Sequence, residues 1–155
     1  MIVKKLKSFL DENGVKYLII HHSPAFTAQE VAQSAHISGN EIAKSVMVKV
    51  DDELAMVVLP ASRMVDCSTV SKAAGGADVL LADEEDFEKR FPGCDLGAMP
   101  PFGNLYDLKV YLHPDLSEDE EIAFNAGSHT ELVKLKYADY ERLAGSSITM
   151  LPPEM

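Results

Sequence analysis

The stretch from residue 43 to residue 59, AKSVMVKVDDELAMVVL, decides the fold that the sequence predicts. It holds two runs rich in Val, Met and Leu, at 43–50 and 54–59, separated by the acidic segment 51–53. Apolar runs of this length on either side of a short polar turn are typical of two antiparallel strands. The centre of the chain is therefore predicted to be a β-hairpin.

Segments on both sides of this hairpin alternate between extended and helical patterns. Further strands are predicted at 17–22, 79–82, 108–112, 122–125 and 131–136. Apolar spacing, capping residues and Gly or Pro stops predict helices at 2–13, 27–35, 68–74, 83–91 and 137–144. Strands joined mostly by hairpins, with helices interspersed, indicate an α+β domain around a largely antiparallel sheet.

Length and composition limit the classes of protein to which the chain can belong. Its 155 residues suit a single domain spanning 1–155. No apolar run approaches the roughly 20 residues of a membrane-spanning helix, and the charged N-terminus does not resemble a signal peptide. Cys67 and Cys94 lack the spacing of a metal or redox pair. We therefore expect a soluble cytoplasmic protein with no membrane partner.

The charge is unevenly placed along the chain. Residues 1–75 hold 8 Lys and Arg against 8 Asp and Glu, whereas residues 76–155 hold 6 against 17 and supply the whole net charge of −11. Strong binding to nucleic acid requires a basic stripe, and the sequence displays none. This argues against DNA binding and predicts that any RNA partner is contacted only at a short end, with the first half of the chain as the better candidate.

Lys44 is the first candidate functional residue. It opens a strand otherwise filled with Ser, Val and Met. A lysine in this setting is either a solvated strand end, as most lysines are, or a cation directed into a cleft. Lys49 lies on the same strand beside the acidic turn, and we interpret it as a surface residue.

The loop Gly97-Ala-Met-Pro-Pro-Phe-Gly103 is the second candidate. Two glycines and two consecutive prolines predict a rigid turn with a face poor in side chains, where backbone N–H groups can approach a ligand. Such donors stabilise the oxyanion that develops in acyl transfer. The alternative is a purely structural connection between a helix and a strand.

Histidines and known catalytic motifs give weaker signals. His129 in the turn 127–130 is either a surface residue or part of a pocket wall. His21 and His22 are adjacent on a predicted strand, so they point to opposite faces and cannot chelate one metal ion together. The chain contains no Gly-x-Ser-x-Gly elbow, no phosphate-binding Gly-rich loop ending in Lys-Ser/Thr, and no His-Glu-x-x-His. No metal or cofactor is predicted.

The order of these features resembles the YbaK/prolyl-tRNA-synthetase-associated editing domains. The matching segments are His22-Ser-Pro-Ala-Phe-Thr-Ala-Gln-Glu30, Ile42-Ala-Lys44-Ser-Val-Met-Val-Lys49, Val57-Val-Leu-Pro-Ala-Ser-Arg-Met-Val-Asp66, the Gly97–Gly103 loop, and Asn125-Ala-Gly-Ser-His129. They run in order along nearly the whole chain. The resemblance implies a mixed, mostly antiparallel sheet with flanking helices.

The resemblance also implies an activity and a site. Members of this family hydrolyse the ester between a wrong amino acid and the terminal adenosine of tRNA, and free-standing members act in trans. Carried over, Lys44 is the functional lysine and Gly97 begins the loop that faces the carbonyl group. His129 lines the amino-acid pocket. The remaining substrate-binding residues are expected to be Phe26, Ser45, Pro101, Gly127 and Ser128.

The chemistry of the substrate sets the expected mechanism. An aminoacyl ester is already activated, and the vicinal hydroxyl of the terminal ribose can position or deprotonate water, so no protein nucleophile is needed. Backbone N–H groups near Gly97 hold the oxyanion, and Lys44 anchors the terminal nucleotide or its phosphate.

The expected specificity comes from the histidine in the Gly-x-His turn, which resembles alanine-directed members of the family. It favours Ala-tRNA(Pro), with Cys-tRNA(Pro) next, and prolyl-tRNA synthetase as a possible partner. The alternative function is a non-catalytic module that binds a nucleotide or the acceptor end of tRNA on the same fold.

Overall fold

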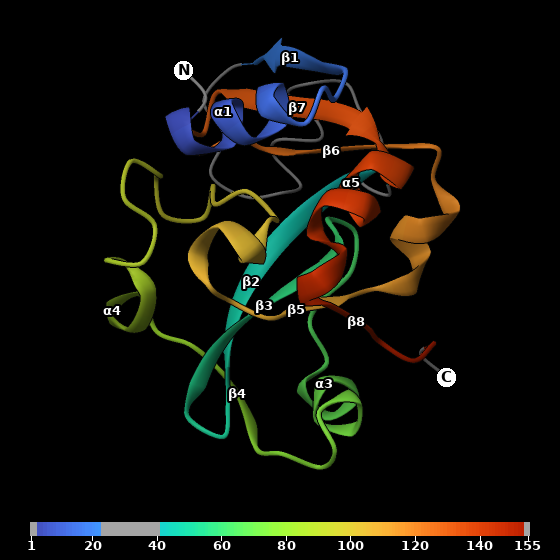
Figure 1. Cartoon of the computed structure of the whole chain (residues 1–155). Coiled ribbons are helices and arrows are strands. Elements are labelled where there is room, and N and C mark those ends of the chain that lie inside the picture. The colour runs from blue at the N-terminus through green and yellow to red at the C-terminus, as the bar shows by residue number, and fades with distance from the viewer. Residues whose placement is uncertain (1–2, 23–40, 154–155) are drawn as a thin grey trace.

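The computed structural model describes residues 3–22 and 41–153, and within these ranges eight strands form one sheet. The strand order is β1-β7-β6-β2-β3-β5-β8, with β4 paired to β2. The strands are β1 (Tyr17–His21), β2 (Ile42–Val50), β3 (Glu53–Pro60), β4 (Val79–Leu81), β5 (Val110–Leu112), β6 (Glu121–Asn125), β7 (Glu131–Lys136) and β8 (Ile148–Met150). The α-helices are α1 (Lys4–Glu12), α3 (Cys67–Ala73), α4 (Glu84–Phe87) and α5 (Tyr137–Ala144) (Figure 1).

The predicted central hairpin is confirmed as β2 and β3. The two strands pair antiparallel from Ala43 opposite Pro60 to Val50 opposite Glu53. Two residues close the turn, Asp51 and Asp52, with φ of 48° and 67°. Positive φ at both central residues is the conformation of a type I′ hairpin turn, and Asp tolerates it better than bulky residues do.

The sheet is mixed and mostly antiparallel, as the sequence predicted. The antiparallel pairs are β1 with β7, β6 with β7, β2 with β3, and β2 with β4. The parallel pairs are β2 with β6, β3 with β5, and β5 with β8. Parallel partners are distant in sequence, so hairpin patterns could not reveal them. The three-residue strand β8 was also missed.

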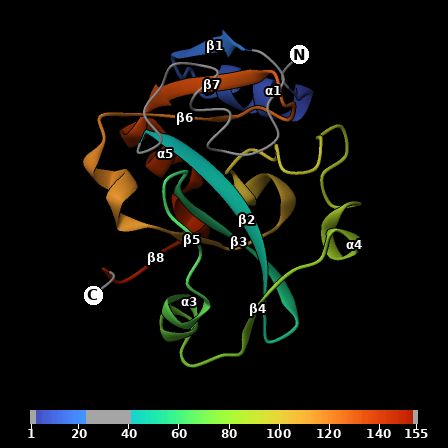
Figure 2. The same cartoon turned by 180° about the vertical axis from the view of Figure 1, so that it is seen from behind.

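One face of the sheet is covered by α1 and α5, and α3 covers part of the other (Figures 1 and 2). Phe102 is fully buried on the first face. Its ring centroid lies 5.5 Å from that of Phe9, 5.6 Å from that of Phe124 and 5.1 Å from that of Tyr140. These tilted and edge-on contacts join α1, β6 and α5 to the loop that carries Phe102.

Three predicted helices are confirmed, and one is shorter than expected. The segment 83–91 was predicted to be helical throughout, but α4 ends at Phe87. Its start has the reciprocal capping box of Asp83 and Asp86. Arg90, expected at the helix C-terminus, instead donates to the carbonyl oxygen of Tyr106 at 3.0 Å. This tertiary contact overrides the local helical preference. The helix predicted at 27–35 lies outside the described residues, and the single-domain boundary stays a prediction.

Candidate active site

The predicted Gly97 loop and the predicted Gly127 turn are bonded to each other. The amide of Asp95 donates to the carbonyl oxygen of Gly127 at 2.8 Å. The amide of Gly127 donates to the carbonyl oxygen of Ala98 at 2.9 Å. The amide of Val3 also donates to the carbonyl oxygen of Ala126 at 2.9 Å. Residues about thirty apart in sequence thus form one backbone unit, which we call the loop pair (95–98 and 126–127).

Glycine is required where the loop pair is tightest. Gly127 has a φ of +100°, and a Cβ atom there would lie 3.0 Å from the Cβ of Val3. Gly97 has a φ of +84°, which also disfavours any side chain. The two glycines are therefore needed for the backbone conformation, and Gly127 also for the close approach of Val3.

The rest of the predicted loop is anchored in the core. The hydroxyl of Tyr140 donates to the carbonyl oxygen of Pro101 at 2.8 Å. Both Pro101 and Phe102 are buried. At Gly103 a Cβ would lie 2.6 Å from the carbonyl oxygen of Leu108, so only glycine fits. These contacts agree with the predicted rigid turn, and the surroundings of Pro101 give it a structural role. The contact of Pro101 with substrate stays a prediction.

The amide of Gly97 has a weak acceptor. It points at the thioether sulfur of Met99, 3.3 Å away, whereas the amide of Ala98 is bonded to the carbonyl oxygen of Asp95 at 3.0 Å. A thioether is a poor acceptor, so a carbonyl oxygen or an oxyanion could replace it at little cost. Gly97 therefore carries an N–H group that is suited to polarise an ester.

A hollow of about 250 Å³ lies beside this amide. Its lining includes Ser45 and Met47 of β2, Ala82, Phe87, Leu96 and Gly97. The hydroxyl oxygen of Ser45 is buried and has no hydrogen-bond partner among the described residues. A buried hydroxyl without a partner costs stability unless a ligand or water satisfies it. Ser45 and Gly97, both predicted site residues, are thus brought to one hollow.

Strand β2 has an open edge beside this hollow. On that side it pairs with β6 at Ile42 and Ala43, and with β4 from Val48 onward. Among the described strands, none pairs with residues 44–46 on that side. The opening therefore lies between the part of β2 that pairs with β6 and the part that pairs with β4.

Lys44 and Ser45 are consecutive on β2, so their side chains project to opposite faces of the sheet. Lys44 lies on the face of Leu59, its cross-strand partner, away from the Ala43–Met47 core. It is half-buried, and burial lowers the pKa of its ammonium group below the usual value. Within the described part of the chain it forms no ion pair. A half-buried cation without a counter-ion is poised to meet an anion.

Asn125 is the functional candidate that sequence reasoning did not assign. The pairing of Ala43 with Phe124 places Asn125 beside Lys44 and on the same face. Asn125 is only 9% exposed, and no described residue bonds its Oδ1 atom. Its position in the motif 125–129 was a signal, but only the strand pairing shows its neighbour. Lys44 and Asn125 are thus neighbours on one face of the sheet. Within residues 3–22 and 41–153 the Lys44 ammonium has no ion-pair partner and the Asn125 Oδ1 atom accepts no hydrogen bond.

The remaining predicted residues lie near the loop pair or outside the described residues. The Ser128 hydroxyl is 3.4 Å from that of Thr130 and 3.5 Å from the carboxylate of the buried residue Glu131. His129 is half-buried in the same turn. Phe26 lies outside the described residues. The catalytic and binding roles of all these residues stay predictions.

Metal-ligand clusters and membrane-spanning helices are both absent from the described residues. No three His, Cys, Asp or Glu side chains group there as metal ligands would. None of the helices in that part of the chain is long and apolar enough to cross a membrane.

Comparison with known proteins places the chain in a family. The profile of the family described as "Aminoacyl-tRNA editing domain" matches residues 22–143. The chain belongs to this family. The prediction of an aminoacyl-tRNA editing deacylase is thereby confirmed at the level of the family. The match spans the strand of Lys44, the Gly97 loop and the Gly127 turn.

Individual members of the editing-domain family differ in the substrates that their names give. The chain is 30% identical over 146 residues to the "Multifunctional Ser/Thr-tRNA deacylase ProXp-y" of Escherichia coli K12, covering 91% of this chain and 87% of that protein. It is 24% identical over 140 residues to the "Prolyl-tRNA editing protein ProX" of Acetoanaerobium sticklandii, covering 86% and 85%. The crystal structure of hypothetical protein APE2540 has the same fold, with a TM-score of 0.83 at 18% identity over 96% and 99% of the two chains.

Proposed function

We propose that this chain hydrolyses the ester of a small amino acid mischarged on tRNA, acting as a separate protein in trans. The observation that carries the proposal is the Gly97 amide, which is bonded to a thioether 3.3 Å away at the edge of the hollow that contains Ser45. An editing site needs one preorganised donor for the carbonyl oxygen and a small recess for the amino acid, and this hollow offers both.

The proposed reaction needs only water as the nucleophile. The oxygen of water attacks the carbonyl carbon, and the negative charge that develops on the carbonyl oxygen is stabilised by the Gly97 amide. The bond between this carbon and the ribose oxygen then breaks, and the proton lost by water ends on that oxygen. Lys44 binds the terminal nucleotide through its phosphate and thereby positions the ester. The products are the free amino acid and tRNA.

The proposed substrates carry small side chains. A hollow of about 250 Å³ is below the roughly 300–1,000 Å³ of sites for drug-sized ligands, which suits an aminoacyl group. Ala-tRNA(Pro) is the first candidate and Cys-tRNA(Pro) the next, because a synthetase rejects a smaller amino acid weakly, with one methylene contributing about 1–3 kcal/mol.

A second candidate substrate class has a side-chain hydroxyl. The buried hydroxyl of Ser45 lacks a partner among the described residues, and a Ser or Thr side chain could supply one. The name of the relative ProXp-y, a Ser/Thr-tRNA deacylase, agrees with this possibility.

A panel of mischarged tRNAs tests the proposal. Purified protein is mixed with Ala-, Cys-, Ser- and Thr-charged tRNA, and release of the amino acid is followed against correctly charged Pro-tRNA(Pro). We expect rapid release from at least one small mischarged amino acid and none from Pro-tRNA(Pro). Equal turnover of Ala- and Cys-tRNA(Pro) would refute the preference for alanine. No release from any member, with tRNA still bound, would favour the non-catalytic binding module.

We also propose the cytoplasm as the place of action, because charged tRNA is used there, and prolyl-tRNA synthetase as a partner. Residues 76–155 hold 17 acidic and 6 basic residues, and this acidic half could face a basic surface of the synthetase. Pull-down with the synthetase at low and high salt checks this, and capture that does not depend on salt would contradict an electrostatic contact.

A further inference from the structure

Four lysines gather on one face of the sheet, although the sequence has no basic stripe. Lys134 pairs across the sheet with Ala123, which pairs with Ile42, so Lys134 lies on the same face as Lys44, which is two positions further along β2. Lys136 is two residues beyond Lys134 and shares its face. Lys16 lines the same hollow as these two. We call Lys16, Lys44, Lys134 and Lys136 the lysine face.

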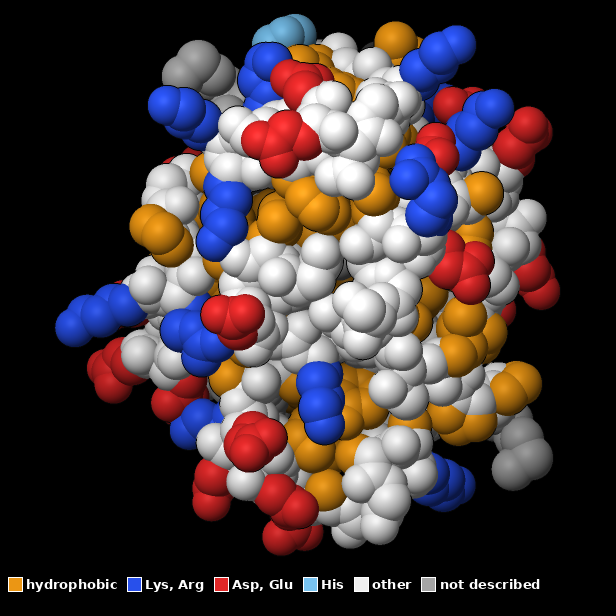
Figure 3. Space-filling view, viewed as in Figure 1, with side chains coloured by type: hydrophobic (Ala, Val, Ile, Leu, Met, Phe, Trp, Pro, Cys, Tyr) orange, Lys and Arg blue, Asp and Glu red, His pale blue; other side chains and the backbone are white. Residues whose placement is uncertain are grey.

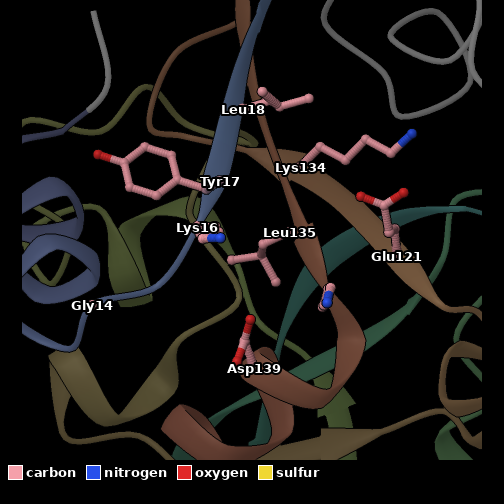
Figure 4. A pocket seen from close by; sticks show the side chains of 9 residues that line it. Gly14, Lys16, Tyr17, Leu18, Glu121, Lys134, Leu135 and Asp139 are labelled. Carbon is pink, nitrogen blue, oxygen red and sulfur yellow. The ribbon is translucent and has the colours of Figure 1, made fainter.

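None of these four lysines forms an ion pair with a described residue, whereas two other lysines, Lys7 and Lys49, do. Lys7 is bonded to Asp11 at 2.6 Å and Lys49 to Asp86 at 2.8 Å. The hollow beside Lys134, which has a volume of about 400 Å³, also contains Glu121 and Asp139, but no nitrogen–oxygen distance within 4.0 Å joins them to its lysines. In Figure 4, Lys134 and Glu121 project to one side of the strands and Tyr17 to the other.

The side of the molecule seen in Figure 3 carries charges of both signs. On the helix-covered side, basic and acidic side chains are interspersed and no large patch has a single sign (Figure 3). The net charge of −11 repels a polyanion at long range. Salt screens that repulsion beyond roughly 8–10 Å, so a local group of cations can still bind phosphate. The lysine face is the place where the structure offers such a group.

The lysine face begins at the proposed site, since Lys44 belongs to both. Only β6 lies between β2 and β7. Lys134 is aligned across the sheet with Ile42, two residues before Lys44 on β2. Ideal sheet spacings give about 12 Å between the Cα atoms of Lys44 and Lys134, a distance that a few nucleotides span. Lys136 lies further from Lys44 along β7, and Lys16 precedes Tyr17, which pairs with Leu135.

We infer that the lysine face binds the phosphates of the unpaired 3′ strand of tRNA, leading its aminoacyl end to Lys44 and the Gly97 loop. This inference rests on the proposed function, because it takes Lys44 to be at the terminal nucleotide. Lys134 and Lys136 come from the acidic half of the chain. The sequence favoured the first half of the chain for RNA contact, but the proposed RNA-binding surface also needs these two lysines from the second half.

The test compares a long and a short substrate. The double variant Lys134→Glu/Lys136→Glu is assayed on mischarged tRNA and on 3′-aminoacyl-adenosine, which lacks every upstream phosphate. The matched control is Lys109→Glu, an exposed lysine before β5. We expect kcat/KM on tRNA to fall at least tenfold, mainly through KM, with no change on aminoacyl-adenosine. The slope of log kcat/KM against log salt should become shallower by about 0.7 for each phosphate that the variant no longer binds.

The outcomes separate this inference from the proposed function. Equal loss on both substrates, or a loss as large in the Lys109→Glu control, would overturn the inference. If the unmodified protein hydrolyses neither substrate, the proposed function fails. Binding of a fluorescent single-stranded RNA that ends in CCA then remains as a direct readout. Its binding must weaken in the double variant and not in the control, or the inference fails as well.

Discussion

The two parts of the candidate site differ in how their polar groups are satisfied. In the loop pair, the amides of Asp95, Ala98 and Gly127 donate to backbone carbonyl groups at 2.8–3.0 Å. Around the open edge of β2, the ammonium of Lys44 is half-buried. Among the described residues it has no counter-ion, and the Asn125 side-chain oxygen has no hydrogen-bond partner. The first region is built for stability and the second carries unused bonding capacity.

This difference predicts which substitutions should change the stability of the fold and which should change the deacylase activity. A satisfied hydrogen-bond network stabilises the fold, and an unsatisfied buried group destabilises it unless a ligand is bound. Substitutions in the loop pair should therefore lower stability first. Substitutions at the open edge should lower activity while leaving the fold intact or making it more stable.

The largest expected effect follows from Lys44→Met, which removes the charge and keeps the length of the side chain. We expect kcat/KM on mischarged tRNA to fall at least about 100-fold, a loss typical of a group that positions or stabilises the reacting centre. Single-turnover deacylation assays measure this. Lys49→Met on the same strand is the matched control and should retain activity, since its ammonium pairs with Asp86 at the surface. Normal activity of folded Lys44→Met would remove Lys44 from the site.

The same variant has a predicted effect on stability. Burial lowers the pKa of Lys44 below 10.5, so the folded state binds this proton less tightly than the unfolded state. The resulting cost is present at neutral pH and is lost as the pH rises through the lowered pKa toward 10.5. Lys44→Met should therefore unfold at an equal or higher temperature at pH 7, as measured by calorimetry. A clear decrease in Tm would show that Lys44 is a structural residue.

Gly127→Ala should have the next largest effect, and it should act on the fold. The positive φ and the Val3 Cβ atom 3.0 Å from the added methyl group predict a loss of about 1–3 kcal/mol in the free energy of unfolding. Urea denaturation measures this loss. Gly145→Ala is the control, because no atom lies within 4 Å of its added Cβ and its φ is negative. Equal stability of the two variants would contradict the tight packing of the loop pair.

Tyr140→Phe should have the smallest effect. It removes the hydrogen bond to the carbonyl oxygen of Pro101 and leaves a buried acceptor unsatisfied, which costs about 1–2 kcal/mol. The ring contact with Phe102 stays, so the fold should persist. Thermal unfolding gives the loss in stability, and the deacylation rate at low temperature shows whether the loop still positions Gly97. A loss of activity without a loss of stability would move Tyr140 into the candidate site.

Much of the fold could be predicted because its signals are local. The hairpin of β2 and β3, the helices α1, α3 and α5, and the turn after Asn125 follow from apolar spacing and from Gly or Asp at turns. Helix α4 was predicted too long because Arg90 bonds to a distant carbonyl group. Strand β8 was missed because its three residues are stabilised by pairing with β5.

The candidate site could be predicted only as separate parts. Lys44, Gly97 and Gly127 were each found in the sequence, and the hydrogen bonds that join Gly97's loop to Gly127 could not be found there. Asn125 was seen as part of a motif, but its place beside Lys44 depends on the parallel pairing of β2 and β6. The finer specificity stays a proposal, because it depends on the shape of the hollow beside Ser45.

By itself the sequence determined the periodic elements, the glycines at positive φ and the membership of an editing-domain family, because these depend on local sterics and on an ordered set of motifs. Only the tertiary structure decided which polar groups meet. It placed Lys134 and Lys136, from the acidic half of the chain, on the face of Lys44. The physical reason is that side chains alternate across strands, so the neighbours of a residue are set by strand pairing and not by distance along the chain.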